Sequence, residues 1–117
     1  MVDKFQVSDR TDANRVVLYT DGYINNLGGD EIATRCYQHI DQGRKHFVLN
    51  LEKSKIVNSI GISILIEIIE KLVEIDGRLA FCCLTPTIAK TFRIMGLTQY
   101  AKIYESEAEA LAAVGAD

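Results

Sequence analysis

The sequence predicts an α/β fold, with a mixed, mostly parallel β-sheet on which helices pack, in the order ββαβαβαβα. Segments with the apolar pattern of strands come between segments whose apolar residues recur with the period of a helix. The chain has 117 residues, 48% hydrophobic and 25% charged, and contains only one proline. This composition suits one compact domain that spans residues 1–117. Strands that alternate with helices imply right-handed crossovers and a largely parallel sheet.

The first two strands are predicted to form a hairpin. Residues 5–7 and 15–20 are the strand segments, and the polar residues 8–14 between them are typical of a turn. A loop over residues 21–26 follows.

The next two elements are a helix and a buried strand. The helix ends near Gly43, and one of its faces carries Ile32, Cys36 and Ile40. Residues 47–49, followed by Asn50 and Leu51, form an apolar run that suits a strand covered on both faces.

The second helix begins near Asn58 and stops at residues 76–77. Its polar residues fall on one stripe: Ser59, Ser63, Glu67, Glu70, Lys71 and Glu74. We interpret the glutamates of this stripe as a solvated face, or otherwise as part of a docking surface. The side chains expected to pack inward are Ile62, Leu65, Ile66, Ile69 and Val73.

The C-terminal part of the chain repeats the alternation. A strand is predicted over residues 78–84 and another over 102–104. Between them, Thr85 is a helix N-cap before Pro86, and the helix ends at Gly96 with three residues inward: Ile88, Phe92 and Met95. Ser106 and Glu109 form a capping box that opens a last helix through Leu111 and Val114.

Charge and hydropathy narrow the class of partner. The net charge is −3 and no Lys/Arg cluster occurs, so direct nucleic-acid binding is disfavoured and a protein partner is favoured. The longest charge-free stretch, residues 56–66, is far shorter than the roughly 18 apolar residues of a membrane-spanning helix. The first residues lack the apolar run of a secretory signal, so we expect a cytoplasmic protein without a membrane partner.

The sequence shows no pattern that would bring catalytic or metal-binding side chains together in one site. We interpret His39 and His46 as exposed or edge side chains. Because neighbouring strand residues point to opposite faces, Cys82 and Cys83 should be separated, so we expect no metal, no cofactor and three free thiols, including Cys36. A small α/β enzyme would need an acid, a base and a nucleophile together, so we expect a protein that is not an enzyme.

Ser59 stands out by its position. It begins the polar stripe of an otherwise apolar helix, so its hydroxyl should face solvent at the helix N-terminus. Free backbone N–H groups and the positive end of the helix dipole favour an anion there, and a phosphate on Ser59 would be tolerated. Simple capping of the helix by Asn58 or Ser59 explains the same residues, and the two roles are compatible.

Several segments along the chain match one known family. They are residues 46–52, 77–79, 85–86, 95–97 and 104–111, together with Asn-Ser-Ile-Gly-Ile at 58–62, where that family shows Asp-Ser-Ser/Thr-Gly-Leu. On these segments the chain resembles the STAS-domain anti-sigma factor antagonists of bacterial partner switching, over nearly its whole length. The resemblance implies the STAS fold. The chain differs from the family pattern at Asn58 and Asn25, where an acid is usual, and at Ile60, where a second hydroxyl is usual.

The resemblance also implies a function. Such proteins bind a histidine-kinase-like serine kinase that is itself the anti-sigma factor, and this frees the sigma factor. Phosphorylation of the first motif serine, here Ser59, stops binding, and a metal-dependent serine phosphatase restores it. By this resemblance we expect partner contacts at Asn25, Asn58, Ser59, Ile60, Gly61 and Ser63, and a monomer or weak dimer. The alternative is a STAS subunit that scaffolds a signalling or lipid-transport complex without being phosphorylated.

Overall fold

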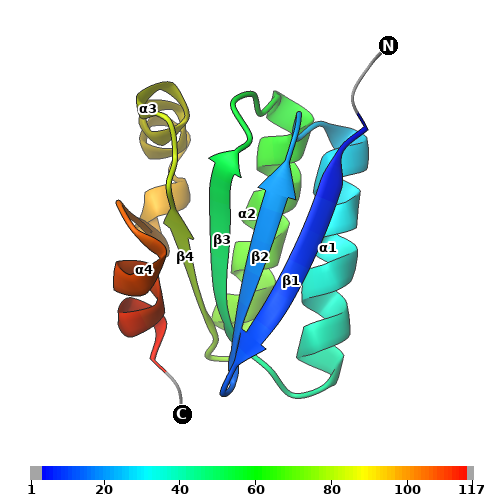
Figure 1. Cartoon of the computed structure of the whole chain (residues 1–117), viewed down its shortest axis with the longest axis vertical. Coiled ribbons are helices and arrows are strands. Elements are labelled where there is room, and N and C mark those ends of the chain that lie inside the picture. The colour runs from blue at the N-terminus through cyan, green and yellow to red at the C-terminus, as the bar shows by residue number, and fades with distance from the viewer. Residues whose placement is uncertain (1–3, 116–117) are drawn as a thin grey trace.

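The computed structural model describes residues 4–115 and confirms the α/β fold (Figure 1). Five strands form one sheet in the order β1-β2-β3-β4-β5; β1 is antiparallel to β2, and the other neighbours are parallel. The elements in chain order are β1 (Gln6–Asp12), β2 (Arg15–Asp21), α1 (Asn26–Asp41), β3 (His46–Lys53), α2 (Ser59–Glu74), β4 (Arg78–Cys82), α3 (Pro86–Ile94), the 3-10 helix η1 (Leu97–Gln99), β5 (Ala101–Tyr104) and α4 (Glu107–Val114).

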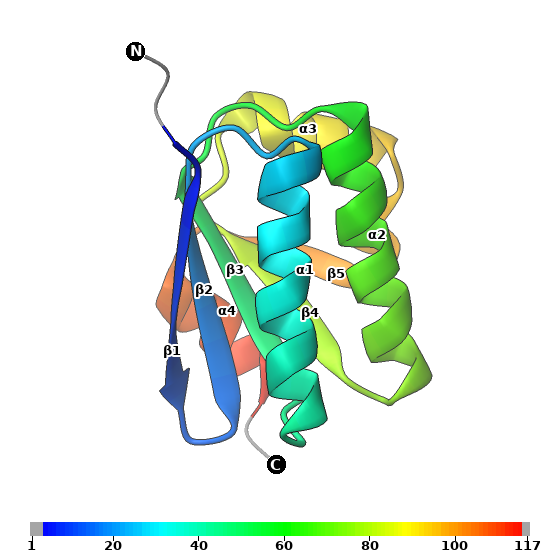
Figure 2. The ribbon, with the colours of Figure 1, turned by 90° about the vertical axis from the view of Figure 1, so that its right-hand side faces the viewer.

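The sheet is covered unequally on its two faces (Figure 2). Helices α1 and α2 lie along one face, and α4 lies on the other. Alternation along β2 sorts the side chains: Val16 and Leu18 join the large core under α1, α2 and α3, whereas Val17 joins a smaller cluster under α4. Among residues 4–115, the helices are too short or too polar to cross a membrane.

Two of the predicted strands end at other residues than expected. β1 continues to Asp12, so most of residues 8–14 is strand, and the turn is confined to Ala13 and Asn14. Polar side chains are tolerated because β1 is an edge strand whose backbone still pairs with β2. β4 ends at Cys82, because Cys83 has a positive φ of 63° that leaves the extended conformation.

The helices begin and end close to the predicted positions, but two inward side chains are wrong. Val73 is 47% exposed, because it lies one turn from Glu70 at the border of the polar stripe. Met95 is 49% exposed, because it is the C-cap of α3, where the chain leaves the helix. The other predicted core residues of α2 and α3 pack into or against the large core: Ile62, Leu65, Ile66, Ile69, Ile88 and Phe92.

Candidate functional site

The loops that follow β2 and β3 are joined at the carboxyl ends of these strands. The N–H of Gly22 donates to the carbonyl of Lys53 at 3.0 Å. The N–H of Ile24 donates to Ile56 at 3.0 Å, and the N–H of Asn58 donates to Ile24 at 3.1 Å. These bonds bring the starts of α1 and α2 to one end of the sheet, where both helices begin side by side (Figures 1 and 2).

Each of these helices is capped by an asparagine. Oδ1 of Asn25 accepts the N–H of Gly28 at 3.0 Å, and Oδ1 of Asn58 accepts the N–H of Gly61 at 2.8 Å. The first turns of α1 and α2 contain no acidic residue. The partial positive charge of both helix starts is therefore not offset by a carboxylate within the turn.

Gly61 is required by the close approach of the two loops. A Cβ on this residue would lie 2.3 Å from the carbonyl oxygen of Ile24, which belongs to the backbone and cannot rotate away. Gly61 is consequently buried, and among the predicted partner-contact residues it packs inward rather than toward solvent.

Ser59 is the first residue of α2 and is exposed. Within residues 4–115 no hydrogen bond engages its Oγ, whereas its carbonyl accepts the Ser63 hydroxyl at 3.0 Å. Helix geometry leaves the N–H groups of Ser59 and Ile60 without intrahelical partners. The chain also has no acid from Lys53 to Ile66, and Lys55 in the preceding loop is exposed.

Large exposed apolar side chains lie on the two helix starts and in the loops that precede them. We call Tyr23, Leu27, Ile56 and Ile60 the apolar rim. Their exposed fractions are 44%, 67%, 60% and 53%. The sequence pointed to Ile60 through its motif, but the other three were missed, because the loop pairing that brings their segments to the same end of the sheet joins distant parts of the chain. Exposed apolar residues grouped in this way are typical of a protein-binding surface.

The start of α2 combines two chemical properties. It offers a solvent-facing hydroxyl at a site that accepts negative charge, next to apolar side chains that a partner would cover. Of the predicted contact residues, Asn25, Asn58, Ser59, Ile60 and Gly61 lie within this helix-start region, and Ser63 lies one turn further along α2.

The acidic stripe of α2 lies outside the apolar rim. Glu67, Glu70 and Glu74 are exposed, and Glu74 forms an ion pair with Lys71 at 3.9 Å. Their exposure agrees with a solvated face.

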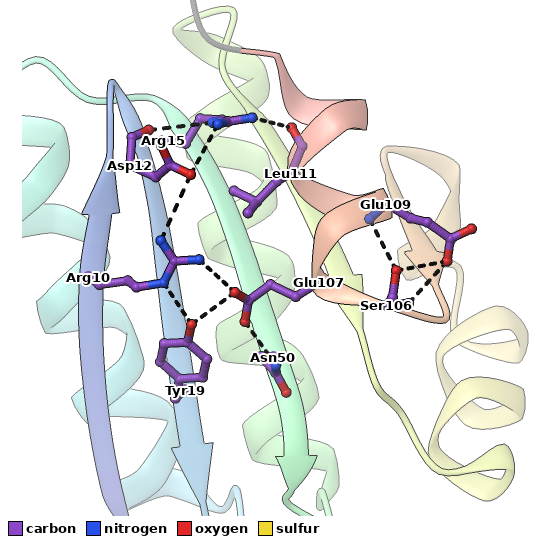
Figure 3. A network of polar contacts seen from close by, with 9 residues as sticks. All are labelled: Arg10, Asp12, Arg15, Tyr19, Asn50, Ser106, Glu107, Glu109 and Leu111. Atoms are coloured by element: carbon purple, nitrogen blue, oxygen red, sulfur yellow. Dashed lines mark hydrogen bonds and ion pairs between the residues drawn. The ribbon is translucent and has the colours of Figure 1, made fainter.

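A second polar cluster fixes α4 to the sheet (Figure 3). Arg10 of β1 donates to Glu107 at 2.7 Å, and Tyr19 of β2 donates to the same carboxylate at 3.0 Å. Asn50 of β3 donates to its other oxygen at 3.2 Å. Burial raises the pKa of Glu107, but these three hydrogen bonds and the Arg10 charge lower it by more, so the net direction is downward.

The last turn of α4 is held from the same side. Arg15 donates to the carbonyl of Leu111 at 3.1 Å and forms an ion pair with Asp12 at 3.1 Å (Figure 3). The predicted capping box is present, since Ser106 Oγ accepts the N–H of Glu109 at 3.2 Å and the backbone N–H of Ser106 donates to the Glu109 carboxylate at 3.2 Å. The cluster is structural, because its hydrogen bonds tie α4 to β1, β2 and β3.

The histidines were expected to be exposed or at an edge, and this is wrong. His46 is 3% exposed within β3. His39 is partly buried, with Nε2 3.1 Å from Asp9 and Nδ1 3.1 Å from Arg44. Burial raises the pKa of Asp9, but hydrogen bonds from His39 and Arg35 lower it below its usual value. Over residues 4–115, no group of three or more His, Cys, Asp or Glu side chains is placed to hold a metal.

Comparison with known proteins agrees with this architecture. BtrV of Bordetella bronchiseptica, a proposed anti-sigma factor antagonist, is 24% identical over 92 residues, or 79% of each chain. The structure of an anti-sigma factor antagonist from Mycobacterium paratuberculosis has a TM-score of 0.82 at 19% identity, and covers 95% of this chain and 94% of that chain.

A third similarity is to the Bacillus cell fate determinant SpoIIAA in its phosphorylated form. The TM-score is 0.72 at 23% identity, and 96% of this chain and 100% of that chain are covered. The model of the STAS domain family matches residues 5–110. The chain therefore belongs to the STAS domain family.

Proposed function

We propose that this chain is a cytoplasmic anti-sigma factor antagonist that is switched by phosphorylation of Ser59. When unphosphorylated, it binds a histidine-kinase-like serine kinase that is itself the anti-sigma factor, and the sigma factor is released. Phosphorylation ends this binding, and a metal-dependent serine phosphatase restores it. The chain acts as one domain and carries out no catalysis itself.

The observation that carries this proposal is the exposed hydroxyl of Ser59 at a helix start without acidic residues, beside the apolar rim. In the transfer step, Ser59 Oγ bonds to the γ-phosphorus of ATP as the bond to ADP breaks, and a base on the kinase takes the hydroxyl proton. The new phosphate brings about −1.5 to −2 charges at neutral pH. The N–H groups at the start of α2 favour that charge, so the domain need not refold to hold it.

The same charge explains how binding ends. A kinase that covers Ile56 and Ile60 must remove water from the neighbouring Ser59. Removing water from a doubly charged phosphate is costly unless the partner supplies cations. A partner adapted to a neutral hydroxyl has no such groups, so the phosphorylated chain dissociates.

A second candidate rests on the two asparagine caps. Asn25 and Asn58 keep the capping hydrogen bonds that an acid would make, but they carry no charge. If the kinase requires those charges, the chain is instead an unphosphorylated STAS subunit that scaffolds a signalling or lipid-transport complex through the apolar rim.

Phosphate transfer separates the two candidates. The purified chain would be incubated with ATP and each histidine-kinase-like serine kinase of the same organism, and phosphate incorporation followed by intact mass and by peptide mapping. We expect one phosphate on the parent chain and none on Ser59→Ala, which should still bind the kinase. Ser63→Ala is the matched control on the same stripe, and it should be phosphorylated like the parent.

A second experiment measures the affinity of Ser59→Asp for the kinase. We expect it to bind the kinase more weakly than the parent with little change in melting temperature. Phosphate incorporation into Ser59→Ala, or parental affinity in Ser59→Asp, would contradict the switch. Binding of the parent with no phosphate on any residue would favour the scaffold.

A further inference from the structure

Cys82 and Cys83 lie on the same face of the sheet, although adjacent residues of a strand normally point to opposite faces. Cys82 is part of the apolar cluster under α4, and Cys83 packs against that same cluster from its edge. The expectation that the strand would separate these two thiols is therefore wrong.

The backbone of Cys83 accounts for this placement. Its φ of 63° lies in the left-handed region, which residues other than glycine adopt rarely. The residue is nevertheless held firmly, since its N–H donates to the carbonyl of Tyr104 at 3.3 Å. Its thiol donates to the carbonyl of Glu105 at 3.7 Å. The turn out of β4 thus brings a second sulfur to the side occupied by the first.

The three cysteines differ in access to solvent. Cys82 is fully buried, Cys83 is half-buried at the edge of the cluster, and Cys36 is buried in the large core on the other face of the sheet. Burial raises the pKa of Cys82, and the adjacent Cys83 thiol raises it further. Burial, with the Asp9 charge, raises the pKa of Cys36 to about 12. A thiol reagent in solution therefore reaches Cys83 first and Cys82 next, whereas Cys36 serves as a control cysteine that is buried in the other core.

We propose that Cys82 and Cys83 form a dithiol site that binds a trivalent arsenical through both sulfurs. Trivalent arsenic is a soft acceptor that prefers two thiols held together over two separate ones, because the second bond closes a ring. The exchange is balanced without an oxidant. Two As–S bonds replace the two As–O bonds of a hydrated arsenical, the two thiol protons leave with those oxygens as water, and arsenic stays trivalent. Loss of both protons as water means that no lasting thiolate is required.

Phenylarsine oxide is the probe that tests this site. The folded chain, reduced with a phosphine and desalted, would be titrated with the probe, and adducts would be counted by native mass spectrometry. We expect one phenylarsenic group per chain, resistant to 2-mercaptoethanol and removed by the dithiol 2,3-dimercaptopropanol. Cys36→Ser should bind like the parent. Cys83→Ser and Cys82→Ala should each lose the dithiol-specific adduct, with at least a 100-fold higher probe concentration needed for half occupancy.

Cys83 is half-buried, so Cys83→Ser decides the question even if Cys82→Ala fails to fold. Retention of the monothiol-resistant adduct in Cys83→Ser, or its loss in Cys36→Ser, would overturn the site. So would binding that appears only after the parent chain is unfolded. The test involves neither phosphate nor a protein partner, so its outcome is independent of the function proposed for Ser59.

Discussion

Helices α1 and α2 begin in nearly the same way, and their difference isolates what is special about Ser59. Each has an asparagine cap whose Oδ1 accepts the N–H of a buried glycine three residues later. The second residue of each helix is an exposed aliphatic side chain, Leu27 in α1 and Ile60 in α2.

The two starts differ at the first helical residue, which is Asn26 in α1 and Ser59 in α2. Both positions are exposed and neither first turn holds an acid, but Asp30 and Glu31 follow the first turn of α1, whereas no acid lies between Lys53 and Ile66 around the start of α2. The asparagine cap and the exposed aliphatic residue of the apolar rim are therefore common to both helix starts. The hydroxyl that can take a phosphate belongs to α2 alone of the pair.

The largest expected difference between the two starts concerns their glycines. In Gly61→Ala the new Cβ meets the Ile24 carbonyl at 2.3 Å, so we expect a loss of about 3 kcal/mol in the free energy of unfolding. In Gly28→Ala the nearest backbone atom, the Tyr23 carbonyl oxygen, is 2.8 Å away, and the remaining contacts are with the ring of Phe5. Higher helix propensity offsets part of that clash, so we expect about 1 kcal/mol. Urea unfolding measures the free energy of unfolding of both variants, and equal losses would contradict the difference between the two glycine positions.

The caps should be equivalent. We expect Asn25→Ala and Asn58→Ala each to lower the free energy of unfolding by about 1 kcal/mol, because each leaves a glycine N–H without its acceptor. Asn26→Ala is the matched control, an exposed asparagine that is not the cap, with an expected change within about 0.5 kcal/mol. A loss in Asn26→Ala as large as in Asn25→Ala would contradict the assignment of the cap.

A third helix start, that of α4, shows what a charged first turn does. Its Glu107 has a lowered pKa in the folded chain, so its contribution to stability is present above the pKa of the unfolded chain and is lost as pH falls through the folded value. We expect Glu107→Gln to cost up to about 1 kcal/mol at pH 7 and less near pH 3, because protonation of the carboxylate removes its contribution as pH falls. Urea unfolding at the two pH values checks this, with the exposed Glu70→Gln as a control that changes little at either. A cost for Glu107→Gln that is the same at both pH values would show that its charge has no role.

The smallest expected effect is the return of an acid to the α2 cap. Asn58→Asp keeps an acceptor for the Gly61 N–H and adds a charge next to Ser59, where the family usually has one. We expect phosphate incorporation by the serine kinase to become a few-fold faster, measured as an initial rate by intact mass. The same substitution at Asn25 is the comparison on α1. An unchanged rate in Asn58→Asp would mean that this kinase has adapted to an amide.

Most of the fold could be predicted because its signals are local. Ile32, Cys36 and Ile40 recur at helical spacing and are buried or partly buried on one face of α1. The Ser106–Glu109 capping box marks the start of α4 with both of its hydrogen bonds formed. Helical periodicity and capping depend on residues close together in the sequence, so both can be recognised without knowledge of tertiary contacts.

The missed features depend on contacts between distant segments. The polar residues of β1 form a strand because of pairing with β2, which their own pattern does not reveal. Tyr23, Leu27 and Ile56 form the apolar rim because two loops pair at one end of the sheet. Alternation failed at Cys83, where a positive φ leaves the strand geometry that the rule assumes.

The central claim is that phosphate on Ser59 changes the binding surface without unfolding the domain. The most direct measurement compares chain phosphorylated at Ser59 with unphosphorylated chain, recording affinity for the serine kinase and melting temperature on the same samples. We predict an affinity lower by about 100-fold or more, with a melting temperature equal to or above that of the unphosphorylated chain. Equal affinities, or an affinity loss that comes with a large drop in melting temperature, would contradict the account.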